Sequence, residues 1–102
     1  MTINDNVFFL HYFYNKVCAF FKKCWSLIKK IWRKIVKFSD VIQILKELIS
    51  RCNKTANAIA VAVKDGNNVL ETVIQDGEMK TDTSRIVQAD QIADDVDNEI
   101  EL

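Results

Sequence analysis

The sequence predicts an all-α fold, and three observations carry this prediction. The 102 residues include no Pro and two Gly, so few residues are suited to the turns between short strands. Apolar residues recur with a helical period between residues 16 and 38, and a second apolar stripe of different phase starts at Val41. We therefore expect a long basic amphipathic N-terminal helix, a second helix antiparallel or angled to it, and an acidic, partly helical C-terminal tail. The corresponding segments are 1–39, 40–66 and 67–102.

The first expected helix covers residues 7–38, with Asn4, Asp5 or Asn6 as its N-cap. On a helical wheel its cations fall in one arc of about 140°. These cations are Lys16, Lys22, Lys23, Lys29, Lys30, Arg33, Lys34 and Lys37. Large apolar side chains fill the opposite half, and the candidate residues for contact with a membrane or a partner are Phe20, Phe21, Trp25, Ile28, Ile31, Trp32, Ile35 and Phe38.

The second expected helix spans residues 40–64. Ser39 and Asp40 interrupt the first apolar stripe, and Asp40 with Gln43 three residues later resembles a capping box. Gly66 suits the position just after a helix C-terminus. The sequence thus predicts a chain break near Ser39 and a helix after it.

Residues 58–75 allow two interpretations. An Ala/Val-rich run, Asp65-Gly66 and a second apolar run are compatible with a β-hairpin. We favour helix, because Ala is depleted in strands and the stripe from Val41 continues in register. A short helix from Asn68 to Gly77, a polar linker over 78–83 and a last helix capped by Ser84 complete the expectation.

Charge is segregated along the chain. The totals are 14 basic and 14 acidic residues, which cancel. Residues 1–54 hold eleven basic and three acidic residues, a net +8, whereas residues 55–102 hold three and eleven, a net −8. The first half is suited to an anionic partner, and the second half can shield it or recruit another protein.

The basic segment favours a non-enzymatic peripheral membrane protein. A cationic face opposite an aromatic and aliphatic face is typical of a helix lying in an anionic membrane surface, which it can also perturb. Its eight cations contribute about 1 kcal/mol each near an anionic leaflet, before screening. Small accessory proteins of viruses and phages use such helices, although the likeness lies in the physical design of the helix and not in matching residues.

Two other binding functions stay open. In one, the apolar stripe packs on the second helix or on a protein partner, and the chain is a structural or interaction protein, a small bundle or oligomer within a larger assembly such as a virion. In the other, the lysines bind nucleic acid. We favour nucleic acid least, because single-strand binders interleave aromatic residues with their cations, whereas a helix places them on opposite faces.

Catalysis has little support in the sequence. His11 is the single histidine, and Cys18, Cys24 and Cys52 show no metal-ligand spacing, so we expect no metal, no cofactor and no enzymatic activity. No signal peptide is visible, and no apolar run approaches the roughly 18 residues of a spanning helix. We expect a cytoplasmic protein at the periphery of a membrane.

Overall fold

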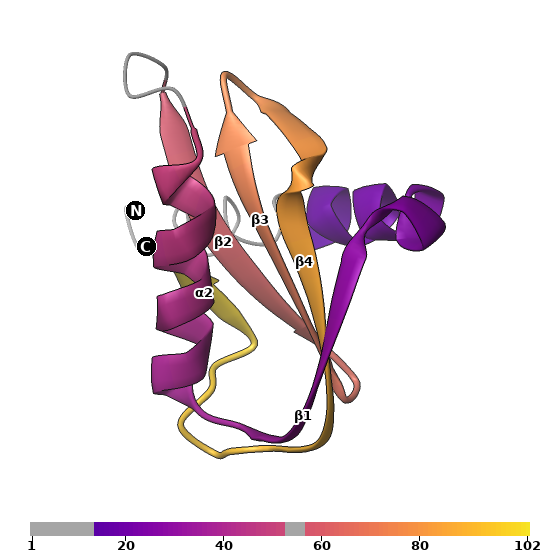
Figure 1. The fold of residues 1–102 in the computed structure, drawn as a ribbon, viewed down its shortest axis with the longest axis vertical. Coiled ribbons are helices and arrows are strands. Elements are labelled where there is room, and N and C mark those ends of the chain that lie inside the picture. Colours follow the sequence, from indigo (N-terminus) through magenta and orange to yellow (C-terminus); the bar gives the residue numbers. More distant parts are fainter. Residues whose placement is uncertain (1–13, 53–56) are drawn as a thin grey trace, which may run out of the picture.

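The computed structural model describes residues 14–52 and 57–102, and within them five strands form one mixed sheet (Figure 1). The prediction of an all-α fold is therefore wrong. In chain order the elements are a helical stretch over residues 14–23, the 3-10 turn η1 (Trp25–Leu27), β1 (Lys29–Val36), α2 (Phe38–Ser50), β2 (Ala58–Asp65), β3 (Asn68–Gln75), β4 (Glu78–Ile92) and β5 (Glu99–Glu101).

The strand order in the sheet is β1-β4-β3-β2-β5. β1 pairs parallel with β4, and every other neighbouring pair is antiparallel. α2 packs on one face of the sheet, against β2 and β3. The helix of residues 14–23 lies on the opposite face, so both faces of the central strands are covered (Figure 1).

Two apolar cores result from this layering. On the α2 side, Leu45 and Leu48 of the helix pack with Val69 and Val73 of β3. On the other side, Val17 and Phe21 of the N-terminal helix pack with Leu70 and Ile74 of the same strand and with Ile86 of β4. Alternate residues of one strand therefore belong to different cores, as the pleat of a strand requires.

Burial on both faces explains why residues 58–74 form strands although they resemble a helix in sequence. Ala60 and Ala62 face α2, whereas Val61 and Val63 face the N-terminal helix. A strand buried on both sides has a continuous apolar run, so the period of two disappears from the sequence. A continuous run also satisfies the spacing of an amphipathic helix, and this produced the wrong expectation of a helix up to residue 64.

Both hairpin turns use the residues that such turns require. Gly66 occupies the first loop position between β2 and β3 with φ 61°, and Asp76-Gly77 joins β3 to β4 with φ values of 52° and 80°. Two-residue hairpin loops need positive φ at these positions because a loop backbone of that conformation matches the right-handed twist of the strands. The hairpin alternative at Asp65-Gly66 is correct, and the expected helix ending at Gly77 is not.

The expected helix over residues 7–38 is also wrong in its second half. Residues 14–23 are helical, but the chain turns at η1 and is extended over β1. Ile31, Ile35 and Val36 are β-branched and favour a strand. A helix would also stack like charges at i,i+4, whereas a strand divides them between two faces. The expected N-cap at Asn4, Asp5 or Asn6 lies outside the described residues.

The predicted break near Ser39 is confirmed to within a few residues, because β1 ends at Val36 and α2 begins at Phe38. Asp40 is not the N-cap residue of α2. It lies in the first turn, where its Oδ2 accepts a hydrogen bond from the backbone N–H of Lys37 at 2.9 Å. α2 ends at Ser50 rather than at residue 64.

The expected polar linker over 78–83 and the helix after Ser84 are replaced by β4. Ser84 is fully buried, and its hydroxyl lies 2.7 Å from that of Thr72 on β3. Its Oγ also donates to the carbonyl oxygen of Lys80 at 2.6 Å. The Ser84 hydroxyl, which the sequence suggested as a helix cap, therefore forms hydrogen bonds with buried polar groups inside the sheet.

Candidate interaction surface at the β1 edge

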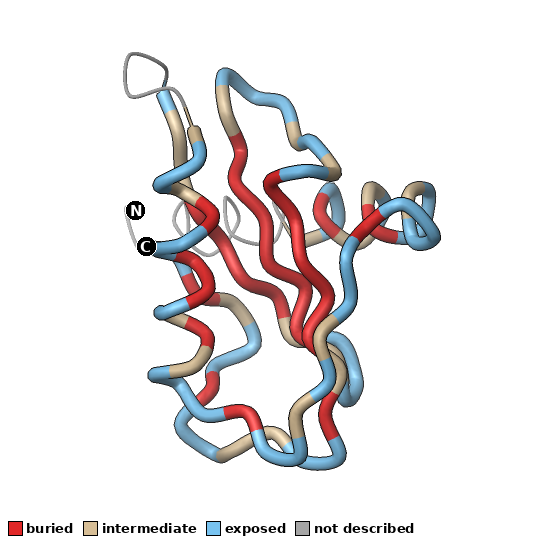
Figure 2. Tube along the Cα trace, in the orientation of Figure 1, coloured by how far each residue is buried: buried red, intermediate tan, exposed pale blue. Residues whose placement is uncertain are grey.

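β1 is an edge strand, and most of it is exposed. β4 is its only neighbour in the described sheet. Figure 2 shows the contrast between the buried central strands and the largely exposed β1. An edge strand of this kind presents side chains and unpaired backbone groups to a partner.

Three large apolar side chains are exposed in η1 and in the first half of β1. Leu27 is 73% exposed, Trp32 is 62% exposed and Trp25 is 36% exposed. Lys30 and Lys34 flank Trp32 at intervals of two residues, so these three share one face of the strand. We call Trp25, Leu27, Lys30, Trp32 and Lys34 the Trp–Lys patch.

Lys30 fixes the turn that carries two of the patch residues. Its Nζ donates to the carbonyl oxygen of Trp25 at 2.6 Å and to that of Ile28 at 3.3 Å. The same ammonium lies 5.2 Å from the centroid of the Trp25 ring, within the range of a cation–π contact. Lys30 therefore holds η1 against the start of β1, and Trp25 and Leu27 project from an ordered turn.

The predicted cationic face is divided by the structure. Lys22 and Lys23 are exposed at the end of the N-terminal helix, and Lys29 and Lys34 are exposed on β1. Arg33 alternates with Lys34 and faces α2, where its Nη1 lies 3.7 Å from Oδ1 of Asp40. Lys16 and Lys37 are also exposed, in the N-terminal helix and before α2. No acidic residue interrupts residues 14–39 in the sequence, but Asp40 and Asp95 contact the end of this segment in the structure.

The predicted apolar face is divided too. Phe21 and Ile28 are buried in the core beside the N-terminal helix, and Phe20 packs against it. Ile31 is half-buried on β1. Trp25 and Trp32 belong to the Trp–Lys patch, whereas Ile35 (44% exposed) and Phe38 (41% exposed) lie at the other end of β1 and at the start of α2. A single apolar face over residues 16–38 therefore does not exist.

Comparison with protein-family models, with curated proteins and with solved structures gives no match.

The most unusual interior group is Glu71, on the face of β3 that α2 covers. Its side chain is fully buried, and neither carboxyl oxygen has a hydrogen-bond partner. Burial raises the pKa of Glu71 to about 9, against the opposing effect of the Arg33 charge. The carboxyl group is therefore neutral at pH 7. Arg85, its neighbour in register on β4, donates from Nη1 to the carbonyl oxygen of Ser84 at 2.9 Å.

Potential metal ligands are not clustered in the described part of the chain. Residues 14–52 and 57–102 contain no cluster of three or more potential metal ligands from His, Cys, Asp and Glu. Cys18, Cys24 and Cys52 are free thiols. Burial raises the pKa of Cys18, and the Asp65 charge raises it further, so this thiol is a weak nucleophile. His11 lies outside the described residues.

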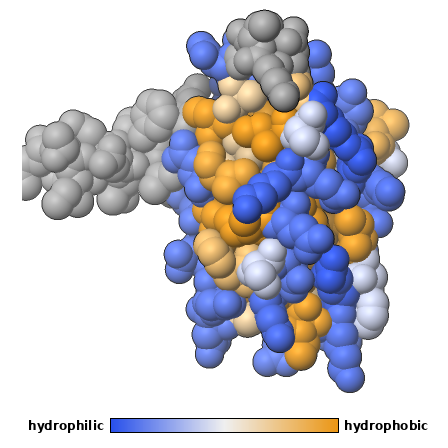
Figure 3. Space-filling model, turned by 60° about the vertical axis from the view of Figure 1, so that its left-hand side comes forward, coloured by the Kyte–Doolittle hydropathy of each residue, from blue (hydrophilic) through white to orange (hydrophobic). Residues whose placement is uncertain are grey.

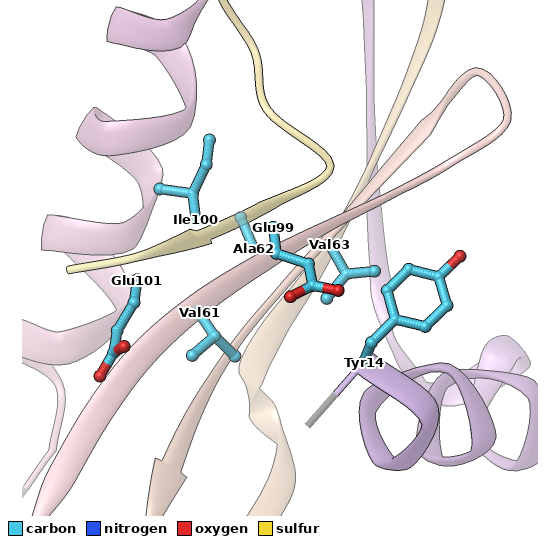
Figure 4. A pocket seen from close by; sticks show the side chains of 7 residues that line it. All are labelled: Tyr14, Val61, Ala62, Val63, Glu99, Ile100 and Glu101. Carbon is cyan, nitrogen blue, oxygen red and sulfur yellow. The ribbon is translucent and has the colours of Figure 1, made fainter. Parts of the chain in front are cut away.

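Two of the concave features elsewhere on the molecule have mainly apolar linings. One is a small apolar cavity between Tyr14 and the paired strands β2 and β5, flanked by Glu99 and Glu101 (Figure 4). The other is a shallow groove on the outer side of α2, lined by Phe38, Ile42 and Lys46 among others. Figure 3 shows apolar patches among polar groups on this side of the molecule. Glu99 and Glu101 line the cavity beside Tyr14, and Lys46 lines the groove on α2.

Sequence reasoning identified the two tryptophans and the lysines of the patch, but it did not select Leu27 as a site residue. On a helical wheel Leu27 is one of many apolar residues. Its exposure follows from η1, and the cue for that turn was weak because residues 24–28 contain no Gly or Pro.

Proposed function

We propose that this protein is a non-enzymatic peripheral membrane protein that attaches to an anionic membrane through the Trp–Lys patch. The single observation that carries the proposal is the exposure of Trp25, Leu27 and Trp32 within a segment of eight cations and no acids. Exposed apolar patches rimmed by charge mark membrane or protein interaction sites. The chain would attach through a turn and an edge strand rather than through a helix lying flat on the membrane.

The chemistry of each group fits its place at the membrane surface. Indole rings favour the headgroup level, where their apolar body and polar N–H are both satisfied. Leu27 can enter the acyl boundary, and its full burial contributes about 1.5–3 kcal/mol. Lys22 and Lys23 precede the turn in the sequence and Lys29 follows it, and each adds about 1 kcal/mol near an anionic leaflet. No helix in the described residues is long and apolar enough to cross the membrane.

A single-stranded nucleic acid is the main competing partner for the same surface. Trp32 between Lys30 and Lys34 is an aromatic residue interleaved with cations, which is how single-strand binders are built. Leu27 favours the membrane, because an aliphatic side chain that is 73% exposed cannot stack on a base. The two partners therefore predict different effects for a substitution at residue 27.

The test is co-sedimentation with phosphatidylserine-rich and phosphatidylcholine vesicles over a salt series, with tryptophan emission recorded in parallel. Both tryptophans of the chain lie in the patch, so a blue shift on binding reports its insertion. We expect binding to anionic vesicles at low salt, weakened about tenfold or more by Leu27→Ser with Trp32→Ser, which removes a few kcal/mol of apolar burial. Lys46→Gln, on the exposed side of α2, is the matched control and should bind normally.

Absence of binding to anionic vesicles at low salt contradicts the proposal. Binding that survives Leu27→Ser with Trp32→Ser contradicts the role of the patch. Quenching by oligo(dT) that depends on Trp32 but not on Leu27, together with no vesicle binding, assigns the surface to nucleic acid instead.

A further inference from the structure

The two edges of the sheet carry opposite charge. β1, at one edge, includes Lys29, Lys30, Arg33 and Lys34 and no acid, whereas β5, at the other edge, is Glu99-Ile100-Glu101. Within the described residues each edge strand has one neighbour in the sheet. Each therefore leaves backbone N–H and C=O groups along its outer side unpaired by the sheet.

The charges also lie on matching faces. Figure 4 shows the carboxylates of Glu99 and Glu101 on the opposite side of β5 from Ile100. Ile100 belongs to the core under α2, and the glutamates lie in register with Val63 and Val61, which face the N-terminal helix. On β1, Lys30 lies in register with Ile86 of β4, which packs in that same core beside the N-terminal helix, and Lys34 alternates with Arg33, which faces α2.

The strand directions fix the orientation of a junction between these edges. β1, β4 and β2 run one way and β3 and β5 the other, as the pairings require. If the sheet continues from β5 of one copy to β1 of the next, and both copies have the same orientation, the new pair of strands is antiparallel. Glutamates of one copy and lysines of the other then lie side by side on one face.

We propose that copies of this chain associate head to tail, with β5 of one copy pairing with β1 of the next to continue the sheet. Pairing of β1 with β1 sets lysine against lysine, and pairing of β5 with β5 sets carboxylate against carboxylate, so both symmetric junctions are disfavoured. The inference goes beyond membrane attachment, because it uses the backbone edge of β1 and the opposite end of the sheet.

The junction is heterologous, and this determines how assembly depends on concentration. A head-to-tail contact leaves one free edge at each end of the assembly, so growth does not stop at a dimer unless the rotation closes a ring. β5 is short, but residues on either side extend its contact with β2. Lys64 N–H donates to the Asn98 carbonyl and Leu102 N–H to the Ala60 carbonyl, both at 2.8 Å. Pairing over so few residues is weak and strongly salt-dependent.

The test is sedimentation velocity of the full chain without lipid, over a concentration series at low and high salt. We expect a weight-average mass that rises continuously above that of the monomer at low salt and falls back at high salt. Glu99→Lys with Glu101→Lys should keep the protein monomeric, and so should Lys34→Glu. Mixing these two variants restores complementary edges and should restore the increase in mass.

Lys46→Glu and Glu47→Lys, both exposed on α2, are charge-reversal controls that should assemble like the native chain. A mass that stays monomeric at all concentrations at low salt overturns the proposal, as does assembly that persists in both edge variants. Failure of the mixture to assemble overturns the β5–β1 pairing. Vesicle binding by the Glu99→Lys, Glu101→Lys variant is a separate readout, so the membrane proposal can fail or stand independently.

Discussion

The guanidinium of Arg33 on β1 reaches the first turn of α2, where its Nη1 lies 3.7 Å from Oδ1 of Asp40. The other carboxylate oxygen, Oδ2, accepts the Lys37 N–H at 2.9 Å. Asp40 thus joins the end of the edge strand to the start of the helix. The hydrogen bond and the ion pair make separable contributions to stability.

We expect the hydrogen bond to contribute more than the ion pair. Asp40→Ala removes an acceptor for a helix-terminal N–H and should lower the free energy of unfolding by about 1 kcal/mol. Arg33→Gln removes the ion pair together with the charge that acts on Glu71. The 42% exposure of the Arg33 side chain means that solvent screens the ion pair, so the loss should be below about 0.5 kcal/mol. Urea unfolding of both variants and of Asp40→Asn measures this. A larger loss for Arg33→Gln than for Asp40→Ala contradicts the assignment.

Local signals in the sequence predicted the start of α2 correctly, because Ser39 and Asp40 interrupt one apolar stripe and begin another. The strands were missed for a different reason. β2 and β3 are buried on both faces, so Val61 and Ala62 are both apolar although they face different cores. The second covering layer is a helix distant in sequence, and only tertiary packing shows that both faces need apolar residues.

Gly77 should be sensitive to substitution although no atom crowds it. Its φ is 80°, and a Cβ built there meets nothing within 4 Å. The cost of Gly77→Ala is therefore the backbone strain of an L-residue at positive φ, about 1–2 kcal/mol. Unfolding by urea should show a lower midpoint with an unchanged slope. Glu78→Ala, at the exposed start of β4, is the control, and equal stability of the two variants would contradict this account of the turn.

The candidate surface was only half predictable. The lysines, Trp25 and Trp32 were evident as a basic and aromatic segment, because composition survives an error in secondary structure. Their partition was not evident: a helix sorts residues at intervals of three and four, whereas a strand sorts them at intervals of two. Lys34 and Arg33 fall in the same arc of a helical wheel, but as consecutive residues of a strand they lie on opposite faces of β1.

Substitutions of two leucines should distinguish the role of the hydrophobic core from that of the Trp–Lys patch. Leu45 on α2 is fully buried, so Leu45→Ala should cost about 2–5 kcal/mol and reduce the melting temperature markedly. Leu27 is 73% exposed, so Leu27→Ala should change stability by no more than about 0.5 kcal/mol while weakening vesicle binding. Calorimetry and co-sedimentation on the same two variants give both readouts. Strong destabilisation by Leu27→Ala would mean that this side chain packs inside the protein rather than on its surface.

Glu71 should make the protein less stable as the solution becomes alkaline. Its pKa in the folded chain, about 9, lies above the ordinary value of 4.5, so between these two values the folded state holds a proton that the unfolded state has lost. Stability from this group is complete below pH 4.5 and decreases as the pH rises towards 9, by up to about 1.4 kcal/mol per pH unit. Glu71→Gln has nearly the same shape and does not titrate. The difference in unfolding free energy between this variant and the native chain should therefore grow in favour of the variant from pH 5 to pH 9. Denaturant titrations across this range measure it, and a difference that stays constant with pH would show that the buried carboxyl is ionised in the folded protein at neutral pH.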